Sequence, residues 1–212
     1  MGAREDSIIM TNDLLDKSTV KRRKAAIALR KGNCSDEICS ALMNALKMEE
    51  SNPHWETQVE IVKTIGVLKC VNSVEYIREY ILEKEDEFSL LGMASATAYI
   101  RLRRKTLSDV STVIELINTN SYSIMEGTME ALGYDRMIPS TEDQNIIIER
   151  CFNFGKNRDK GYGDPRYGLA AAFAGWDSER VKDFLNECLK SKDVPLLYVS
   201  ENSLKRKYVK LR

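Results

Sequence analysis

Histidine, proline and glycine are scarce in this 212-residue sequence, which contains 1, 4 and 11 of them. The single histidine, His54, cannot form a His-based metal site within one chain. The shortage of proline and glycine leaves few breaks between elements, which favours long helices over many short strands. No stretch approaches the roughly 18–20 consecutive apolar residues of a membrane-spanning helix. The sequence therefore predicts helices and no membrane span.

An excess of charge of either sign is also missing. Lys plus Arg and Asp plus Glu number 32 each, so the formal net charge is zero. Proteins built mainly to hold nucleic acid usually carry a clear basic excess, so nucleic acid is not the expected partner. The N-terminal sequence MGAREDSIIMTND lacks the apolar region of a secretory signal. We therefore expect a cytoplasmic protein.

The five cysteines are odd in number and scattered, at positions 34, 39, 70, 151 and 188. In a cytoplasmic protein, reduced thiols explain such a set best. Cys34 and Cys39 do not have the C-x-x-C spacing of zinc and redox sites. The sequence thus predicts no metal site, no cofactor and no disulfide.

An internal repeat is the main signal in the sequence. Five segments share a charged or polar entry, an apolar helix rich in small residues and a turn, and they lie at 21–32, 57–70, 90–103, 123–136 and 165–176. Aligning Leu29, Leu68, Ile100, Leu132 and Ala174 gives steps of 39, 32, 32 and 42 residues. These steps fit two-helix repeats of roughly 30–45 residues.

Each of these first helices precedes a second segment with helical periodicity. The second helices are expected at 35–48, 72–84, 108–118, 140–155 and 177–191. The fourth opens with Ser140-x-x-Asp143, a pattern similar to a capping box. One helix pair cannot bury its own apolar face, so the pairs are expected to be stable only as a stack.

The first helices resemble those of HEAT-type repeats, the armadillo-type and PBS-lyase-like helical repeat family. The resemblance is carried by Arg22-Arg23-x-Ala25-Ala26-x-Ala28-Leu29-x-x-Gly32, by Met125-Glu126-x-x-Met129-Glu130-Ala131-Leu132-Gly133 and by Asp164-Pro165-Arg166. It implies an all-α fold, a right-handed α-α superhelix of about five two-helix repeats. We expect a lead-in over residues 1–17, the solenoid over 18–191 and a basic capping helix over 192–212. On that last helix, Leu204, Tyr208 and Leu211 would form one stripe.

Acidic residues gather on the expected second helices, which usually line the concave side of HEAT-type arrays. Residues 37–92 hold 11 acids and 5 bases, and residues 106–155 hold 8 acids and 2 bases. The alternatives are a solvated helix surface and an inner surface that attracts a basic protein. The acids predicted to touch such a partner are Glu75, Glu79, Asp109, Glu115, Glu142 and Asp143.

The loop before the fifth repeat is longer than a repeat turn needs. It contains Tyr162 and Asp164 and leads to Arg166 and Tyr167, residue types that are enriched in binding hot spots. Trp176 follows that helix and completes the predicted partner-binding set. The alternative is a plain inter-repeat loop with turn glycines.

No catalytic set stands out in the sequence, so we predict a non-catalytic, protein-binding scaffold, monomeric or in a heterodimer. A narrower hypothesis is a bacterial immunity protein that neutralises a toxin. The alternative is a DNA-binding protein or a HEAT-like alkylpurine DNA glycosylase, in which Asp164 or Asp177 beside Trp176 would be the acid. A third reading, a maturation factor of the repeat-containing lyase type, rests on the fold alone.

Overall fold

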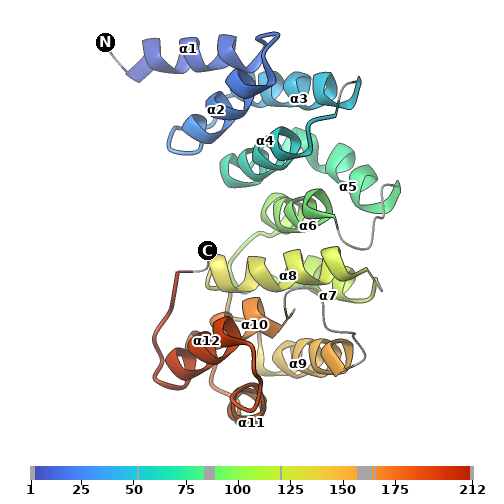
Figure 1. The fold of residues 1–212 in the computed structure, drawn as a ribbon, viewed down its shortest axis with the longest axis vertical. Coiled ribbons are helices and arrows are strands. Elements are labelled where there is room, and N and C mark those ends of the chain that lie inside the picture. Colours follow the sequence, from blue (N-terminus) through green and yellow to red (C-terminus); the bar gives the residue numbers. More distant parts are fainter. Residues whose placement is uncertain are drawn as a thin grey trace. The chain divides into compact units, whose positions relative to one another are not determined.

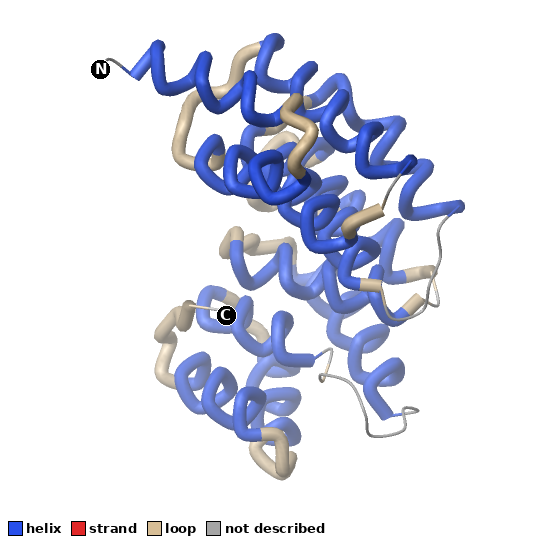
Figure 2. The backbone as a smooth tube through the Cα atoms, turned by 45° about the horizontal axis from the view of Figure 1, so that its top comes forward, coloured by secondary structure: helices blue, strands red, loops and turns tan. Residues whose placement is uncertain are grey.

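The computed structural model describes residues 3–51, 53–83, 89–119, 121–156, 164 and 166–210. Every regular element in these ranges is a helix, which confirms the all-α prediction (Figure 1 and Figure 2). None of these helices combines the length and the apolar character that crossing a bilayer requires. The α-helices are α1 (Ala3–Leu14), α2 (Thr19–Leu29), α3 (Asp36–Ser51), α4 (Trp55–Leu68), α5 (Val74–Glu83), α6 (Leu90–Arg103), α7 (Ser111–Ile117), α8 (Tyr122–Tyr134), α9 (Thr141–Lys156), α10 (Arg166–Ala172), α11 (Glu179–Cys188) and α12 (Val194–Leu204), with short 3-10 helices η1 (Val71–Ser73) and η2 (Phe173–Gly175).

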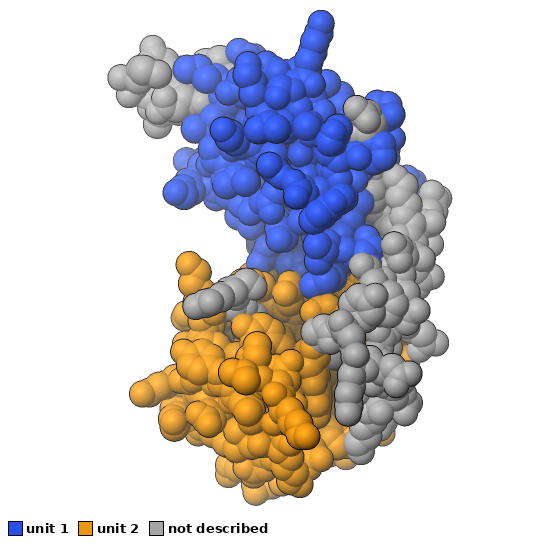
Figure 3. Space-filling model, viewed as in Figure 1, with its two compact units in different colours: residues 1–103 blue, residues 104–212 orange. Residues whose placement is uncertain are grey.

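The chain divides into two compact units, residues 1–103 and 104–212 (Figure 3). In unit 1, α2, α4 and α6 pack side by side in that order. The second helices α3 and α5 pack against α4 and α6, and α1 packs against α2 and α3. Unit 1 is therefore a row of first helices backed by second helices, and the expected lead-in is itself a helix.

Unit 2 repeats this arrangement. Its first helices α8, α10 and α12 pack in that order, and α7 packs against α8 and α9. Helix α11 packs against α9 and α12. Each predicted first and second helix is thus present, and α12 adds a sixth helix to the first-helix series. The predicted pairing is shifted by one helix, because the second helices pack mainly on the first helix that follows them, α3 on α4, α5 on α6, α7 on α8 and α11 on α12. The boundaries predicted at 17/18 and 191/192 remain predictions.

Small residues allow the first helices to approach closely. A Cβ atom placed on Gly66 of α4 would lie 2.7 Å from the Cα of Ala98 on α6. A Cβ on Gly168 of α10 would lie 2.7 Å from the backbone of Met129 on α8. These distances are shorter than any normal carbon contact, so both crossings require glycine.

Buried hydroxyl groups also join neighbouring first helices. Thr64 of α4 donates from its Oγ1 to the carbonyl of Ala26 on α2 at 2.9 Å. Ser203 of α12 donates in the same way to the carbonyl of Ala170 on α10 at 2.7 Å. Each bond satisfies a buried polar group and fixes the register of two helices.

A buried ion pair connects α2 with α3. The Glu49 side chain is 0% exposed and accepts hydrogen bonds from the guanidinium of Arg22, which is also buried. Thr19 donates to the same carboxylate at 2.8 Å, and Nδ1 of His54 lies 3.2 Å from it. A buried charge needs such partners, because an isolated one would be strongly destabilising.

The basic capping helix predicted over 192–212 is wrong in its second half. Helix α12 begins after Asp193, whose carboxylate accepts from the amide of Leu196 at 2.7 Å, and it ends at Leu204. Arg206 then adopts a left-handed φ of 60°, and its guanidinium donates to the carbonyl of Trp176. The basic segment therefore folds back onto unit 2 instead of continuing the helix.

Tyr208 anchors this returning segment. Its ring lies 4.7 Å from the guanidinium carbon of Arg136. A Cβ on Gly175 would lie 2.0 Å from the Tyr208 hydroxyl. Tyr208 thus packs on η2 and does not share a helical stripe with Leu204, while Leu211 lies outside the described residues.

The expectation of five reduced thiols is also wrong, because Cys39 and Cys70 form a disulfide. Cys39 lies in the first turn of α3, and Cys70 directly follows α4. The antiparallel packing of α3 against α4 brings the start of one helix to the end of the other. The 31-residue separation gave no sign of this in the sequence.

Candidate protein-binding groove

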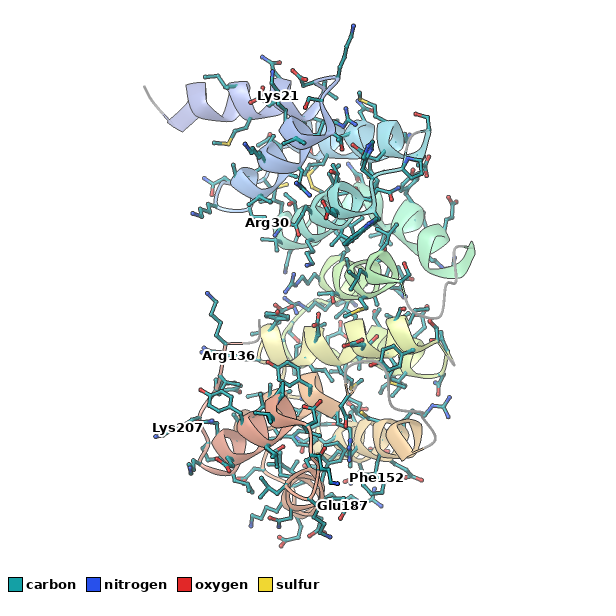
Figure 4. All side chains as sticks on the ribbon, in the orientation of Figure 1. Lys21, Arg30, Arg136, Phe152, Glu187 and Lys207 are labelled. Atoms are coloured by element: carbon teal, nitrogen blue, oxygen red, sulfur yellow. A yellow bond between two sulfur atoms is a disulfide. The ribbon has the colours of Figure 1, made fainter. Side chains whose placement is uncertain are left out.

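A groove of about 500 Å³ runs between the second helices α9 and α11 of unit 2. Figure 4 shows Phe152 and Glu187 next to one another at this place. The residues that line this α9–α11 groove are Ile148, Glu149, Phe152, Arg180, Asp183, Phe184 and Glu187. It therefore combines apolar and acidic side chains from two neighbouring second helices.

The apolar floor of the groove is an extension of the core. Phe173 of η2 contacts Phe184 edge-on, with ring centroids 5.1 Å apart. Phe184 in turn lies 6.0 Å from Phe152, which is only half-buried. The aromatic series thus runs from the interior to the surface. An aromatic side chain that is partly open on a rigid base is a suitable anchor for a partner.

The helical period of α11 produces both the floor and the rim. Val181, Phe184, Leu185 and Cys188 are buried, and Asp183 is exposed beside them. This is the spacing of an amphipathic helix, with one apolar stripe facing the core.

The rim of the groove is acidic. Its charged residues are Glu149, Asp183 and Glu187 against the single cation Arg180. Arg180 lies 3.9 Å from Glu149, and both side chains are more than half exposed, so this ion pair contributes little to stability. Glu187 also pairs with Lys190 at 2.7 Å, which partly neutralises the Glu187 charge. The lining of the groove still holds three acids against one base.

Two buried thiols lie on the same pair of helices. Burial raises the pKa of Cys188 to about 12, and it raises the pKa of Cys151 further. Both side chains stay protonated at neutral pH and act as small apolar residues.

The predicted acids on α5 and α7 lie on exposed surface. Glu75 and Glu79 belong to α5 in unit 1, where Glu75 is 3.6 Å from Arg78. Glu115 is exposed on α7 in unit 2. None of these three carboxylates is among the residues that line the α9–α11 groove.

Two other predicted acids serve their own helix starts. Asp109 precedes α7 and accepts from the amide of Lys105 at 3.0 Å and the hydroxyl of Ser111 at 2.8 Å, and these bonds lower its pKa. The amide of Asp143 donates to the Ser140 hydroxyl at 3.2 Å, which is one half of the predicted capping box, and the Asp143 carboxylate accepts from that hydroxyl at 2.8 Å and not from the Ser140 amide. Glu142 beside them is exposed.

The predicted binding residues around the long loop lie in different environments. Asp164 and Arg166 form an ion pair at 2.6 Å, and this bond raises the pKa of Arg166. Tyr167 is half-buried on α10, and Tyr162 lies outside the described residues. Each of these remains a predicted contact.

The prediction that Trp176 contacts a partner is wrong, because its side chain is only 1% exposed. It packs on Phe173 with ring centroids 4.8 Å apart, and its indole N–H donates to the carbonyl of Met137 at 2.7 Å. A buried indole with its donor satisfied cannot stack on a nucleobase. The sequence did not reveal this, because Trp176 occupies a loop between helices.

The sequence contained only a weak signal for the groove residues that were not predicted. Asp183 and Glu187 flank Phe184 at helical spacing. Their importance depends on α11 lying beside α9, which periodicity within one helix does not reveal.

A separate cluster concerns thiol chemistry. The sulfur atoms of Cys34, Cys39 and Cys70 all lie within 4.8 Å of one another. Two of them are joined in the disulfide, which removes the thiolates that a soft metal ion would need.

No known protein-family description matches the chain, and no curated protein sequence matches it. Among solved structures, the chain is similar to one titled "Designed armadillo repeat protein YIII(Dq)4CqI". The two are 12% identical, with a TM-score of 0.39, and the match covers 93% of this chain and 98% of that one. At this level the similarity adds nothing to the description of helix packing given above.

Proposed function

We propose that this chain is a non-catalytic scaffold that binds another protein through the α9–α11 groove. The partner would present a basic segment with large apolar side chains. The observation that carries this proposal is the half-open aromatic floor beneath a rim of three carboxylates and one guanidinium. An apolar anchor would enter between Phe152 and Phe184, and Lys or Arg side chains would meet the rim.

The groove lies on second helices, as the HEAT-type resemblance predicts for a binding surface. Stacked helix pairs provide such surfaces on a rigid frame. The proposal includes membership of the HEAT-like family, a cytoplasmic location and the narrower role of a toxin-neutralising immunity protein. The last would be excluded if the purified chain recovered only nucleic acid, and no protein, from a native lysate.

A fluorescent peptide binding assay tests the groove directly. The probe is a labelled helical peptide with Leu at positions i, i+4 and i+7 and with Lys or Arg elsewhere. Its Kd is measured by fluorescence anisotropy at two salt concentrations. We expect binding that weakens with salt, and no binding of a twin peptide in which Glu replaces Lys and Arg.

Matched variants locate the binding. The pair Asp183→Asn and Glu187→Gln should raise the Kd about tenfold, since it removes two of the rim carboxylates. The control pair, Glu75→Gln and Glu79→Gln, has the same i, i+4 spacing on an exposed second helix and should leave the Kd unchanged. Phe152→Ala should weaken peptide binding both in the wild-type protein and in the Asp183→Asn, Glu187→Gln variant. Equal effects of the two pairs would exclude the groove, and tighter binding of duplex DNA than of the peptide would favour the DNA-binding alternative.

A further inference from the structure

Three cysteines from three different segments meet in unit 1. Cys34 lies in the turn before α3, Cys39 in the first turn of α3, and Cys70 directly after α4. The sulfur of Cys34 is 3.0 Å from the sulfur of Cys39, which is bonded to Cys70. A free thiol therefore stands in contact with one end of a disulfide.

The three sulfurs differ in their access to solvent. Cys39 and Cys70 are 7% and 2% exposed, whereas Cys34 is exposed. A reductant in solution must approach a disulfide sulfur closely to attack it, and access controls the rate of that attack. The surrounding helices shield Cys39 and Cys70 from such an approach, and Cys34 is the accessible member of the cluster.

We propose that Cys34 is a relay thiol through which the shielded Cys39–Cys70 disulfide exchanges with external dithiols. In the first step the Cys34 thiolate attacks the Cys39 sulfur, a Cys34–Cys39 bond forms, and the Cys39–Cys70 bond breaks. Cys70 leaves as a thiolate and takes up one proton, which balances the proton that Cys34 lost. This step changes no oxidation state and only moves the disulfide toward the surface.

The second step uses a small dithiol as the external reductant. One of its thiolates attacks the exposed sulfur of Cys34, which forms a mixed disulfide and releases Cys39 as a thiolate that takes up a proton. The second thiol of the reductant then displaces Cys34 and closes a ring disulfide within the reductant. The protein disulfide has gained two electrons and two protons, and the dithiol has lost them.

The contact geometry determines which sulfur is attacked. The 3.0 Å contact of Cys34 is with Cys39, so Cys70 is the leaving group. Partial desolvation of the exposed Cys34 thiol, and after it the nearby Asp36 carboxylate, raise the pKa of Cys34. The thiolate is therefore a minor species at neutral pH, and the disulfide resists exchange until Cys34 loses its proton.

Reduction kinetics of the intact protein test the relay. Wild-type, Cys34→Ser and Cys34→Ala proteins are mixed with dithiothreitol, quenched with acid, alkylated and mapped by mass spectrometry. We expect both variants to lose the Cys39–Cys70 bond about tenfold more slowly than the wild type, because they lack the intramolecular step. In concentrated denaturant all three proteins should react at the same rate. A Ser40→Ala variant, altered on the exposed side of α3, should behave as the wild type in both conditions.

Mapping the untreated wild-type protein gives an independent readout that needs no variant. After incubation at mildly alkaline pH and acid quench, a minor fraction should carry the Cys34–Cys39 bond in place of Cys39–Cys70. Equal native reduction rates for wild type and both variants would overturn the relay. It would equally be overturned if the purified protein held three reduced cysteines around a bound zinc or copper ion, since the cluster would then be a metal site.

Discussion

At the scale of single residues, Glu49 is a fully buried carboxylate in unit 1. It neutralises buried Arg22 and also accepts from Thr19 and the backbone of His54. Glu49→Gln would leave the Arg22 charge buried without a counter-charge, and breaking a buried pair in this way typically destabilises by about 3–5 kcal/mol. We expect a loss of that size in the free energy of unfolding, measured by urea titration.

Glu75→Gln is the matched control for this substitution. Glu75 is exposed and lies 3.6 Å from Arg78, and such surface pairs contribute at most about 1 kcal/mol. Its midpoint in urea should stay close to that of the wild type. A loss below 1 kcal/mol for Glu49→Gln would contradict the importance of the buried pair.

A second residue-scale prediction concerns Asp36 and Cys34. Partial desolvation, and after it the Asp36 carboxylate, raise the pKa of the exposed Cys34 thiol. Asp36→Asn removes the second cause, so the pKa falls, the thiolate fraction rises, and alkylation by iodoacetamide at pH 7.5 should be roughly two- to fivefold faster. Glu37→Gln, at the next position, serves as the control and should leave the rate unchanged. Slower alkylation of Asp36→Asn would show that the Asp36 carboxylate does not raise the pKa of Cys34.

What the sequence could predict about residues depended on how local the cause was. The hydrogen bond from the Asp143 amide to the Ser140 hydroxyl needs only three residues of spacing, and it is present in the structure. The predictions that Trp176 is a binding residue and that Cys70 is a reduced thiol were wrong, because their partners, Met137 and Cys39, lie 39 and 31 residues away. Contacts over such separations are created by helix stacking, and no short pattern encodes them.

At the scale of elements, the α4–α6 crossing can be tested through Gly66. Replacing a helical glycine by alanine normally stabilises a helix by up to about 1 kcal/mol. Here the new Cβ would meet the Ala98 backbone at 2.7 Å, and overpacking of this kind destabilises by about 1–3 kcal/mol. Gly66→Ala should therefore lower the melting temperature despite its better helix propensity.

Val67→Ala provides the control on the same helix. Val67 is exposed and adjacent to Gly66, so its substitution tests propensity without packing and should be neutral or slightly stabilising. If Gly66→Ala raised the melting temperature as well, the helices would have room to separate and the close crossing would be disproved.

Helix existence followed from periodicity, whereas helix ends depended on local hydrogen bonds. The first and second helices lie in the sequence where the apolar spacing predicts them. The tail after α12 is different, because Lys205, Arg206 and Lys207 suit a helix by propensity alone. The helix stops there because the amides of Arg206 and Lys207 bond back to Ser203 and Asn202, and Tyr208 finds its place on Gly175.

At the scale of the whole molecule, the division into two compact units predicts that a destabilising substitution in one unit affects mainly that unit. In stacked repeats each helix contacts only its neighbours, so a perturbation spreads mainly to the next pair. The stacking itself was visible in the sequence as a period of roughly 30–45 residues. The division after residue 103 was not, because it reflects how many contacts form on each side and not the repeat pattern.

Hydrogen exchange followed by mass spectrometry measures this response in the full chain. Glu49→Gln should accelerate exchange in α2, α3 and α4, where the buried ion pair acts, and leave α10 and α12 as protected as in the wild type. Ser203→Ala is the mirror variant, since it removes the bond to the Ala170 carbonyl in unit 2. It should accelerate exchange in α10 and α12 and leave α2 to α4 unchanged. If either variant accelerated exchange equally in both units, the chain would open as one cooperative block, and the two units would have no separate stability.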